Sequence, residues 1–234
     1  ADIYNLNLQL PAAAVTGKKR EAGSVVEEVD NQAWLNKLSL QASILDFSMY
    51  DRANAISVKV FDTSVMYTNS SLLLDVSSED VTVDFKKLFR EPIAVETIRG
   101  LMLLTHDGDR LHLSTEHLQL KNKHVNTYSR VDIQQSSAED IIVDVQTDFY
   151  QAYGEYVPHY VPVGVMSAAL VDWLDMAIMD GYVPDGAMIL QGKLNDFPFD
   201  DDNGVFQVLF SPQDVTMKFF EGWPLLTNAS AKVK

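Results

Sequence analysis

Histidine is the side chain best able to bind a metal ion or move a proton near neutral pH. The chain has five: His106, His112, His117, His124 and His159. Two ligands on one face of a strand stand two residues apart, and two on one face of a helix stand four apart. No pair of these histidines has either spacing, so no histidine metal site is predicted. The chain also has no cysteine to supply a thiolate ligand or a thiol nucleophile.

A dense acidic cluster, Asp200 to Asp202 followed by Asn203 and Gly204, is the second candidate for metal chemistry. An EF-hand loop needs a central glycine and a glutamate at its twelfth position. Counted from Asp200, Gly204 falls at the fifth position and the twelfth residue is Ser211. The pattern favours a turn in which Asx side chains bond their own backbone, and it leaves open a weak calcium site at Asp200 to Asn203.

Neighbouring carboxylates could act as a general acid and base. Candidate pairs are Glu27 with Glu28, Glu139 with Asp140, and Asp172 with Asp175. Their surroundings are typical of solvated faces and turns. The sequence contains no nucleophile elbow, Walker loop or dinucleotide fingerprint. We therefore predict neither enzymatic activity nor a cofactor, and rank a carboxylate-dependent glycan hydrolase last among the alternatives.

Composition narrows the class of partner. The chain has 234 residues, of which 47% are hydrophobic, and can bury a core. Its formal charge of -15 argues against binding nucleic acid. No apolar run approaches the roughly 20 residues of a membrane-spanning helix. The closing residues NASAKVK alternate as a strand does, which suggests a piece of a longer protein whose anchor lies elsewhere.

The elements that would position a site are mainly strands. Apolar and polar residues alternate along 4–10, 56–60 and 81–85, as in half-buried strands. Asp107-Gly108 predicts a hairpin turn, whereas 11–24 has the composition of a loop. Turns recur about every dozen residues, which predicts a mainly β, meandering antiparallel sheet. Further strands are expected at 118–121, 141–147, 187–194, 205–210 and 215–219.

One amphipathic helix is expected near residues 166–180. Ser167 can cap its start, and Gly181 can take the left-handed conformation just past its end. Ala169 and Ala177 complete an apolar stripe at helical spacing. The larger stripe residues, expected to pack the helix, are Met166, Leu170, Trp173, Leu174 and Ile178.

The predicted strands also share an apolar face. This face is either closed, as a core under the helix, or partly open to the acyl chain of a lipid. At about 0.8 kcal/mol per CH2, a chain of ~16 carbons must recover about 12 kcal/mol on leaving a bilayer. Only a continuous apolar trough could supply that. The lipid-facing or core candidates are Val58, Val60, Val83, Phe85, Leu111, Leu113, Phe206, Val208, Phe210, Met217 and Phe219.

Three segments between about 85 and 226 together resemble the YhdP-type branch of the AsmA-like bacterial envelope proteins. They are KKLFREPIAVETIRGLMLLTHDGDRLHLSTEHLQLKN, YVPVGVMSAALVDWLDMAIMDGYVPDGAMILQGKLNDFPF and DDDNGVFQVLFSPQDVTMKFFEGWPLL. The resemblance implies an elongated, curved antiparallel β-groove in the periplasm of a Gram-negative bacterium. It further implies an anchor in the inner membrane, outside this chain, and a role in moving phospholipid toward the outer membrane. It supplies no catalytic residues.

On this interpretation, residues 1–234 are a single section of a larger repeating β-groove protein, with a possible subdivision into 1–84 and 85–234. Phospholipid acyl chains are the expected partner. The alternative is a closed β scaffold that binds other envelope proteins at its sheet edges without binding lipid. An open apolar trough would distinguish the first hypothesis from the second.

Overall fold

A computed structural model describes residues 2–9, 39–51, 55–68, 70–108, 110–137 and 140–233 of the chain. The predicted loop at 11–24 lies outside the described residues, as do Leu10, Glu27, Glu28 and Glu139. The side chain of Val60, one of the lipid-facing candidates, also lies outside them.

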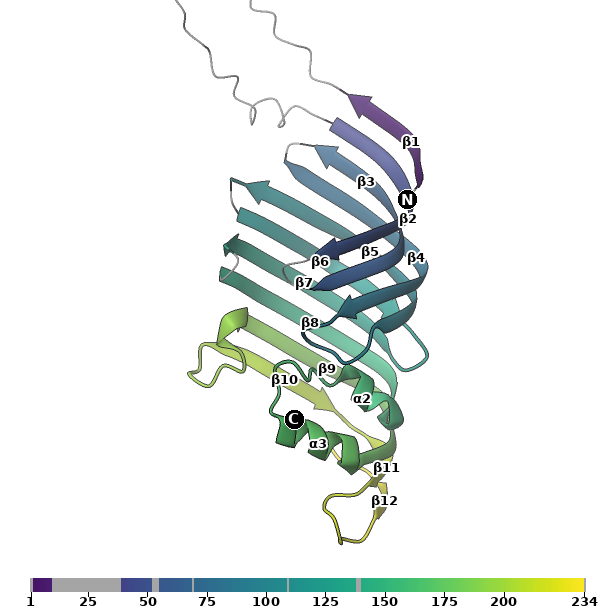
Figure 1. The fold of residues 1–234 in the computed structure, drawn as a ribbon, viewed down its shortest axis with the longest axis vertical. Helices are drawn as coiled ribbons and strands as arrows, with labels where there is room; N and C mark the ends of the chain where they lie inside the picture. The colour runs from purple at the N-terminus through teal and green to yellow at the C-terminus, as the bar shows by residue number, and fades with distance from the viewer. Residues whose placement is uncertain are drawn as a thin grey trace, which may run out of the picture.

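Within the described residues, twelve strands form one antiparallel sheet, drawn as a single curved layer in Figure 1. The strands follow chain order from β1 to β9, and β10 and β11 both pair with β9. This meander confirms the predicted mainly β fold. The strands are β1 Asp2–Gln9, β2 Ser39–Asp51, β3 Ile56–Thr68, β4 Ser71–Phe85, β5 Ile93–Asp107, β6 Arg110–Lys121, β7 Asn126–Ser137, β8 Asp140–Tyr153, β9 Ile178–Lys193, β10 Gly204–Phe210, β11 Gln213–Met217 and β12 Leu226–Ala229.

Two of the predicted turns are confirmed. β5 ends at Asp107, Gly108 has a φ of 59°, and β6 begins at Arg110, so the glycine supplies the positive φ that a tight hairpin needs. The acidic cluster also forms a turn, since Asp202 has a φ of 57° just before β10. Asn203 Nδ2 closes this turn by donating to Asp196 Oδ2 at 3.1 Å.

A line of β-bulges bends the sheet across its strands. The pairing register shifts between β1 and β2, β2 and β3, β3 and β4, β5 and β6, and β6 and β7. In β4, which pairs with β5 without a shift, Asp80 has a φ of 54°. Because each bulge bends its strand and increases its twist, a line of them curves the whole layer.

Polar side chains satisfy the backbone groups that these bulges release. The Ser78 hydroxyl accepts from the Asp62 N–H at 2.6 Å and donates to the Asp62 carbonyl at 2.8 Å. The Asp62 carboxylate in turn accepts from the Asp46 N–H at 2.9 Å. Ser78 is buried, so these bonds replace the ladder bonds that the bulges remove.

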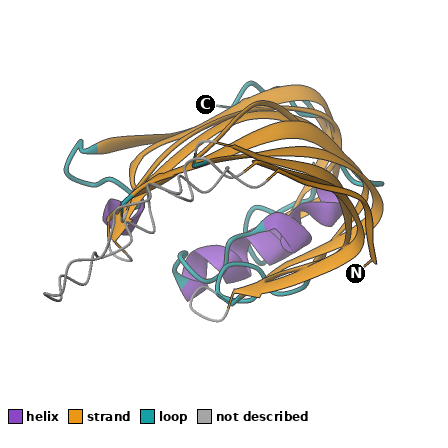
Figure 2. Cartoon of the chain, turned by 90° about the horizontal axis from the view of Figure 1, so that it is seen from above, coloured by secondary structure: helices purple, strands orange, loops and turns teal. Residues whose placement is uncertain are grey.

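Short helices lie inside the curve of the sheet, as Figure 2 shows. The 3-10 turn η1 Gly154–Tyr156 leads into α2 Val157–Tyr160, and α3 Ala168–Ala177 follows. The Oγ atom of Ser167 accepts from the Leu170 N–H at 3.4 Å, which confirms the predicted helix start. No helix of the described residues has the length and apolarity needed to cross a bilayer.

The predicted helix end and the following strand boundary are wrong. α3 ends at Ala177 because Ile178 adopts an extended conformation and pairs with Met217, and Gly181 lies inside β9. β9 therefore starts at Ile178 rather than at residue 187. Pro184 is accommodated in this strand because it stands opposite Gln151, a residue with a φ of 55° that makes no ladder pair.

Candidate functional site

The pairing register shows which side chains share a face of the sheet, because directly paired residues project to the same side. One row of paired residues crosses seven neighbouring strands from β2 to β8, and every member is aliphatic or aromatic. We call the face that carries this row the inner face. The row is Leu40, Tyr67, Leu72, Leu104, Leu113, Ile133 and Val143.

A second apolar row runs beside the first on the inner face. In β2 to β5 it consists of Ala42, Val65, Leu74 and Met102. In β7 to β10 it consists of Val131, Val145, Leu190 and Phe206. Thr115 of β6, which pairs with Val131, separates the two halves.

The inner face is the concave one. A single layer of sheet can hide a side chain from water only on the inside of a bend, and Val76 and Val81 are each only 1% exposed. Their cluster includes Val95 and packs against Leu74 and Met102, which belong to the second inner row. The helices α2 and α3 lie inside this curve (Figure 2), on the same side of the sheet as the apolar rows.

The opposite, outer face carries most of the polar pairs between neighbouring strands. His112 Nε2 lies 2.7 Å from Asp132 Oδ2, and Arg130 Nη2 donates to Asp144 Oδ2 at 2.8 Å. Burial of the Asp132 carboxyl opposes its ionisation, but hydrogen bonds from His112 and Gln134 outweigh this and hold its pKa below the ordinary value. These pairs suit a face in contact with water.

Some apolar side chains also lie on the outer face, but they are more exposed than the first inner row. Leu101 is 53% exposed and Ile142 is 49% exposed. The side chains of the first inner row are half-buried, except that of Val143, which is buried. Strands β3 to β6 pack chiefly against their neighbours in the sheet, so curvature shelters the first row.

The register brings eight of the predicted candidates onto the inner face. Val58 pairs with Val83, and both pack against the buried cluster. The other candidates lie on the same face because they alternate along their strands with these residues or with members of the two apolar rows. The eight are Val58, Val83, Phe85, Leu111, Leu113, Phe206, Val208 and Phe210.

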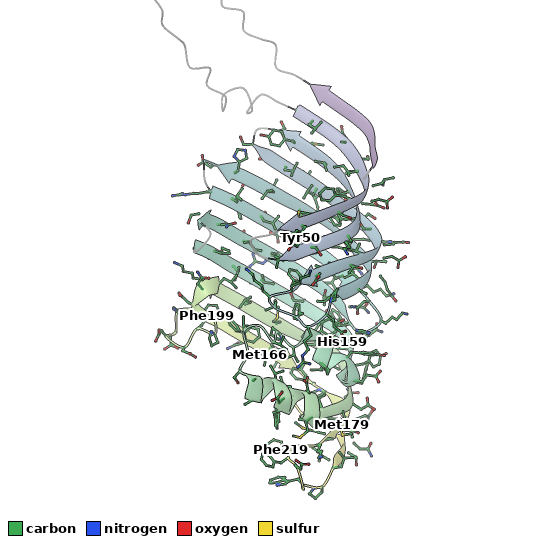
Figure 3. All side chains as sticks on the ribbon, viewed as in Figure 1. Tyr50, His159, Met166, Met179, Phe199 and Phe219 are labelled. Carbon is green, nitrogen blue, oxygen red and sulfur yellow. The ribbon has the colours of Figure 1, made fainter. Side chains whose placement is uncertain are left out.

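The two remaining described candidates lie beside the helix instead. Met217 of β11 pairs with Ile178 and with Leu226. Phe219 follows β11, and its ring lies 5.8 Å from that of Trp173 and 5.7 Å from that of Trp223. Phe219 therefore belongs to an aromatic cluster at the end of the molecule, where Figure 3 labels it.

Polar contacts, as well as its apolar side, hold the helix α3 to the connection between β4 and β5 and to the segment after β11. Trp173 Nε1 donates to the Phe219 carbonyl at 3.0 Å, and the Arg90 guanidinium makes two hydrogen bonds to the Asp175 carboxylate. Asp175 therefore forms an ion pair with Arg90.

The buried side of the helix α3 is rotated relative to the predicted apolar stripe. Val171, outside that stripe, is buried together with Ala177, whereas Leu170 is 44% exposed. Trp173 and Leu174 are half-buried, and Met166 precedes the helix. The helix packs along a narrower line than its periodicity predicts, because it meets one end of the curved sheet rather than a broad flat face.

Sequence reasoning missed two features, one on the inner face and one at the edge of the sheet. Phe199 is buried over Gly192 and Gly204, which lie opposite each other in β9 and β10, and Phe197 contacts Phe206 at 5.4 Å between ring centroids. The signal was the pair of glycines, since a side chain at either position would overlap the Phe199 ring. The segment DFPF thus packs two aromatic rings against the inner face.

The second missed feature is a group of rings around His124. The imidazole stacks on Tyr156 at 3.8 Å and lies 5.5 Å from His159. These residues are more than 30 positions apart in the sequence, so spacing could not reveal them. Among the described residues, no three histidine, aspartate or glutamate side chains are grouped closely enough to hold a metal ion.

Comparison with known proteins agrees with this architecture. The model of the YhdP protein family matches residues 16–234. The intermembrane phospholipid transporter YhdP of Escherichia coli (strain K12) is 24% identical over 160 residues, which cover 67% of this chain and 12% of that protein. The chain thus spans a small part of the length of this relative. No solved structure matches the chain.

Proposed function

Because the chain belongs to the YhdP family, we propose that its concave apolar face shields phospholipid acyl chains as they pass between the two membranes of a Gram-negative envelope. The observation that carries this proposal is the row of aliphatic and aromatic side chains that crosses seven strands without a polar member. On this proposal the section lies in the periplasm, and the inner-membrane anchor belongs to a part of the protein outside this chain.

The energetics favour a continuous row over scattered patches. An acyl chain of ~16 carbons needs about 12 kcal/mol of apolar contact to leave a bilayer, at about 0.8 kcal/mol for each CH2. A polar side chain within the row would leave several CH2 groups of the acyl chain in contact with water. The first inner row has no such interruption from Leu40 to Val143.

The dimensions suit lipid passage along the sheet. Eleven strands lie side by side in the main path of the sheet. At about 4.8 Å between strands, the inner face extends about 48 Å across them. The rows run in this direction, perpendicular to the strands, so a lipid that follows them advances along the length of the molecule.

The alternative of a closed scaffold requires a covered inner face. Phe206 is 45% exposed and Leu111 is 44% exposed, both on that face. These exposures favour a groove that receives apolar ligands over a dry core. Binding of other envelope proteins at the sheet edges is compatible with either function and stays a prediction.

Native mass spectrometry of the chain purified after expression in bacteria tests the proposal. We expect adducts with the masses of phospholipids, which disappear after extraction with organic solvent. The same chain, delipidated and mixed with vesicles, should regain them. A folded chain that carries no phospholipid before or after exposure to vesicles would overturn the proposal.

A further inference from the structure

A pocket of about 250 Å³ opens at one edge of the sheet, where β5 begins, β6 ends and α2 approaches them. Its polar lining mixes both signs of charge with neutral hydrogen-bonding groups. Figure 3 labels His159 on α2, at this edge. The polar residues of the lining are Glu91, Glu96, Asn122, Lys123, His124 and His159, with the Tyr160 hydroxyl beside them.

The pocket is held in shape by a hydrogen-bond network. Asn122 Nδ2 donates to the Tyr160 hydroxyl at 2.7 Å and to the Ala94 carbonyl at 3.1 Å. Asn122 Oδ1 accepts from the backbone N–H groups of His124 and Val125 at 2.9 and 3.0 Å. The loop between β6 and β7 is therefore fixed to both β5 and α2, and the pocket walls are ordered before any ligand arrives.

The network also sets the state of His124. The Tyr160 hydroxyl accepts from Asn122 and lies 3.2 Å from His124 Nδ1, and in the tautomer in which it donates to Nδ1 the ring proton is on Nε2. Burial lowers the pKa of His124, and the nearby His159 lowers it further. A neutral His124 is therefore a hydrogen-bond donor at neutral pH rather than a cation.

Two charged side chains of the pocket take no part in this hydrogen-bond network, and their charges are of opposite sign. Within the described residues, Lys123 and Glu96 make no ion pair, with each other or with another side chain. Glu91 lies 3.3 Å from His159 Nδ1, at the same pocket. The pocket thus offers an ammonium and an imidazole to an anionic group, and two carboxylates to a cationic group.

The pocket adjoins the inner face. Ile93 lines the pocket, pairs with Val83 across β4 and β5, and packs against the buried cluster of Val81 and Val95. A ligand with a polar head in the pocket could therefore lay an apolar tail directly on the concave face past Ile93.

We propose that this pocket binds the zwitterionic headgroup of a phospholipid that carries a primary amine. In this arrangement Lys123 and the imidazole of His124 face the phosphate, and Glu91 and Glu96 face the ammonium. The proposal rests on the lipid-binding function proposed above and adds a preference among headgroups. Soluble phosphoethanolamine has the same headgroup chemistry without acyl chains, so the experiment must separate the two sources.

The test measures dissociation constants for pyrene-labelled phosphatidylethanolamine and pyrene-labelled phosphatidylglycerol with identical acyl chains. The wild-type chain should bind the ethanolamine lipid at least about fivefold more tightly. Glu96→Gln should remove this preference and leave phosphatidylglycerol binding unchanged. Lys123→Gln should weaken both lipids several-fold, because both carry a phosphate. Lys121→Gln, outside the pocket lining, is the matched control and should change neither.

The remaining outcomes of these titrations distinguish failure of the headgroup proposal from failure of the lipid-binding proposal. Equal binding of both lipids by the wild-type chain overturns the headgroup assignment and leaves the acyl-chain function standing. Binding of neither lipid overturns both proposals. If soluble phosphoethanolamine competes with an inhibition constant as low as the dissociation constant of the lipid, the acyl chains contribute nothing, and the pocket is a site for a soluble zwitterion instead. If Glu96→Gln, like Lys121→Gln, leaves both dissociation constants unchanged, the proposed contact between Glu96 and the lipid ammonium group is wrong.

Discussion

A single strand offers the sharpest comparison between the two faces of the sheet. Phe206 and Leu209 both lie in β10, are 45% and 41% exposed, and project to opposite faces. Replacing each in turn by aspartate introduces the same charge on the same strand. We expect Phe206→Asp to weaken binding of an acyl chain by at least about tenfold, and Leu209→Asp to leave it unchanged.

The magnitude follows from the exposure of the phenylalanine ring. Full burial of a phenylalanine side chain is worth about 1.5–3 kcal/mol, so the 45% still exposed could contribute about 0.7–1.4 kcal/mol to a bound acyl chain. Aspartate removes that contribution and adds the cost of covering an unpaired carboxylate with hydrocarbon, which is several kcal/mol. The acyl chain of the lipid would bend away from the aspartate carboxylate rather than cover it. A loss of about 1.4 kcal/mol, or tenfold, is therefore a lower estimate.

The assay is fluorescence titration of each variant with a phospholipid that has a pyrene-labelled acyl chain. Far-UV circular dichroism and a thermal midpoint close to that of the wild-type chain establish that each variant is folded. Equal loss in the two variants would mean that charge anywhere on β10 disturbs binding. Unchanged binding by a folded Phe206→Asp chain would show that β10 does not line the groove.

Three further changes test how the fold supports this face. Ser78→Ala should destabilise the chain by about 1–3 kcal/mol in urea unfolding, because it leaves the partly buried backbone groups of Asp62 without these hydrogen bonds. A change below about 0.5 kcal/mol would show that these bonds do not support the bulges. Gly164→Ala should loosen α3 from the sheet, since a methyl group there overlaps the Lys87 carbonyl, and faster proteolysis near residue 164 with an intact sheet would detect it. Because the folded-state pKa of His124 lies below its unfolded value, protonation favours unfolding. Stability should therefore fall as the pH drops through about 6.5, and His124→Gln should reduce that fall in the thermal midpoint between pH 7 and pH 5.

Alternation and turn chemistry predicted an antiparallel meander and most of its strands, because both signals are local, but β2 Ser39–Asp51 and β7 Asn126–Ser137 were not among the predicted strands. Asp107-Gly108 specified its hairpin through the positive φ of one glycine. The helix start was equally local, since Ser167 caps it with its own hydroxyl. The helix end was not, because Ile178 continues the apolar stripe in the sequence but is drawn into a strand by pairing with Met217, 39 residues later.

The inner face could be predicted only in part for the same reason. Alternation assigned Phe206, Val208 and Phe210 to one side of their strand, but it could not say which neighbours extend that side into a row. That depends on register, which the bulges shift between most pairs of strands from β1 to β7. The pocket beside His124 was beyond prediction, since it joins segments from β5, β6 and α2.

Photo-crosslinking with a phospholipid that carries a diazirine on its acyl chain identifies the face of the sheet that the hydrocarbon contacts. Peptide mapping of the adducts should place them on the inner face, at residues such as Leu113, Val131 and Val145. Adducts concentrated at Leu101 and Ile142 on the outer face, or no adducts on a folded chain, would contradict the account.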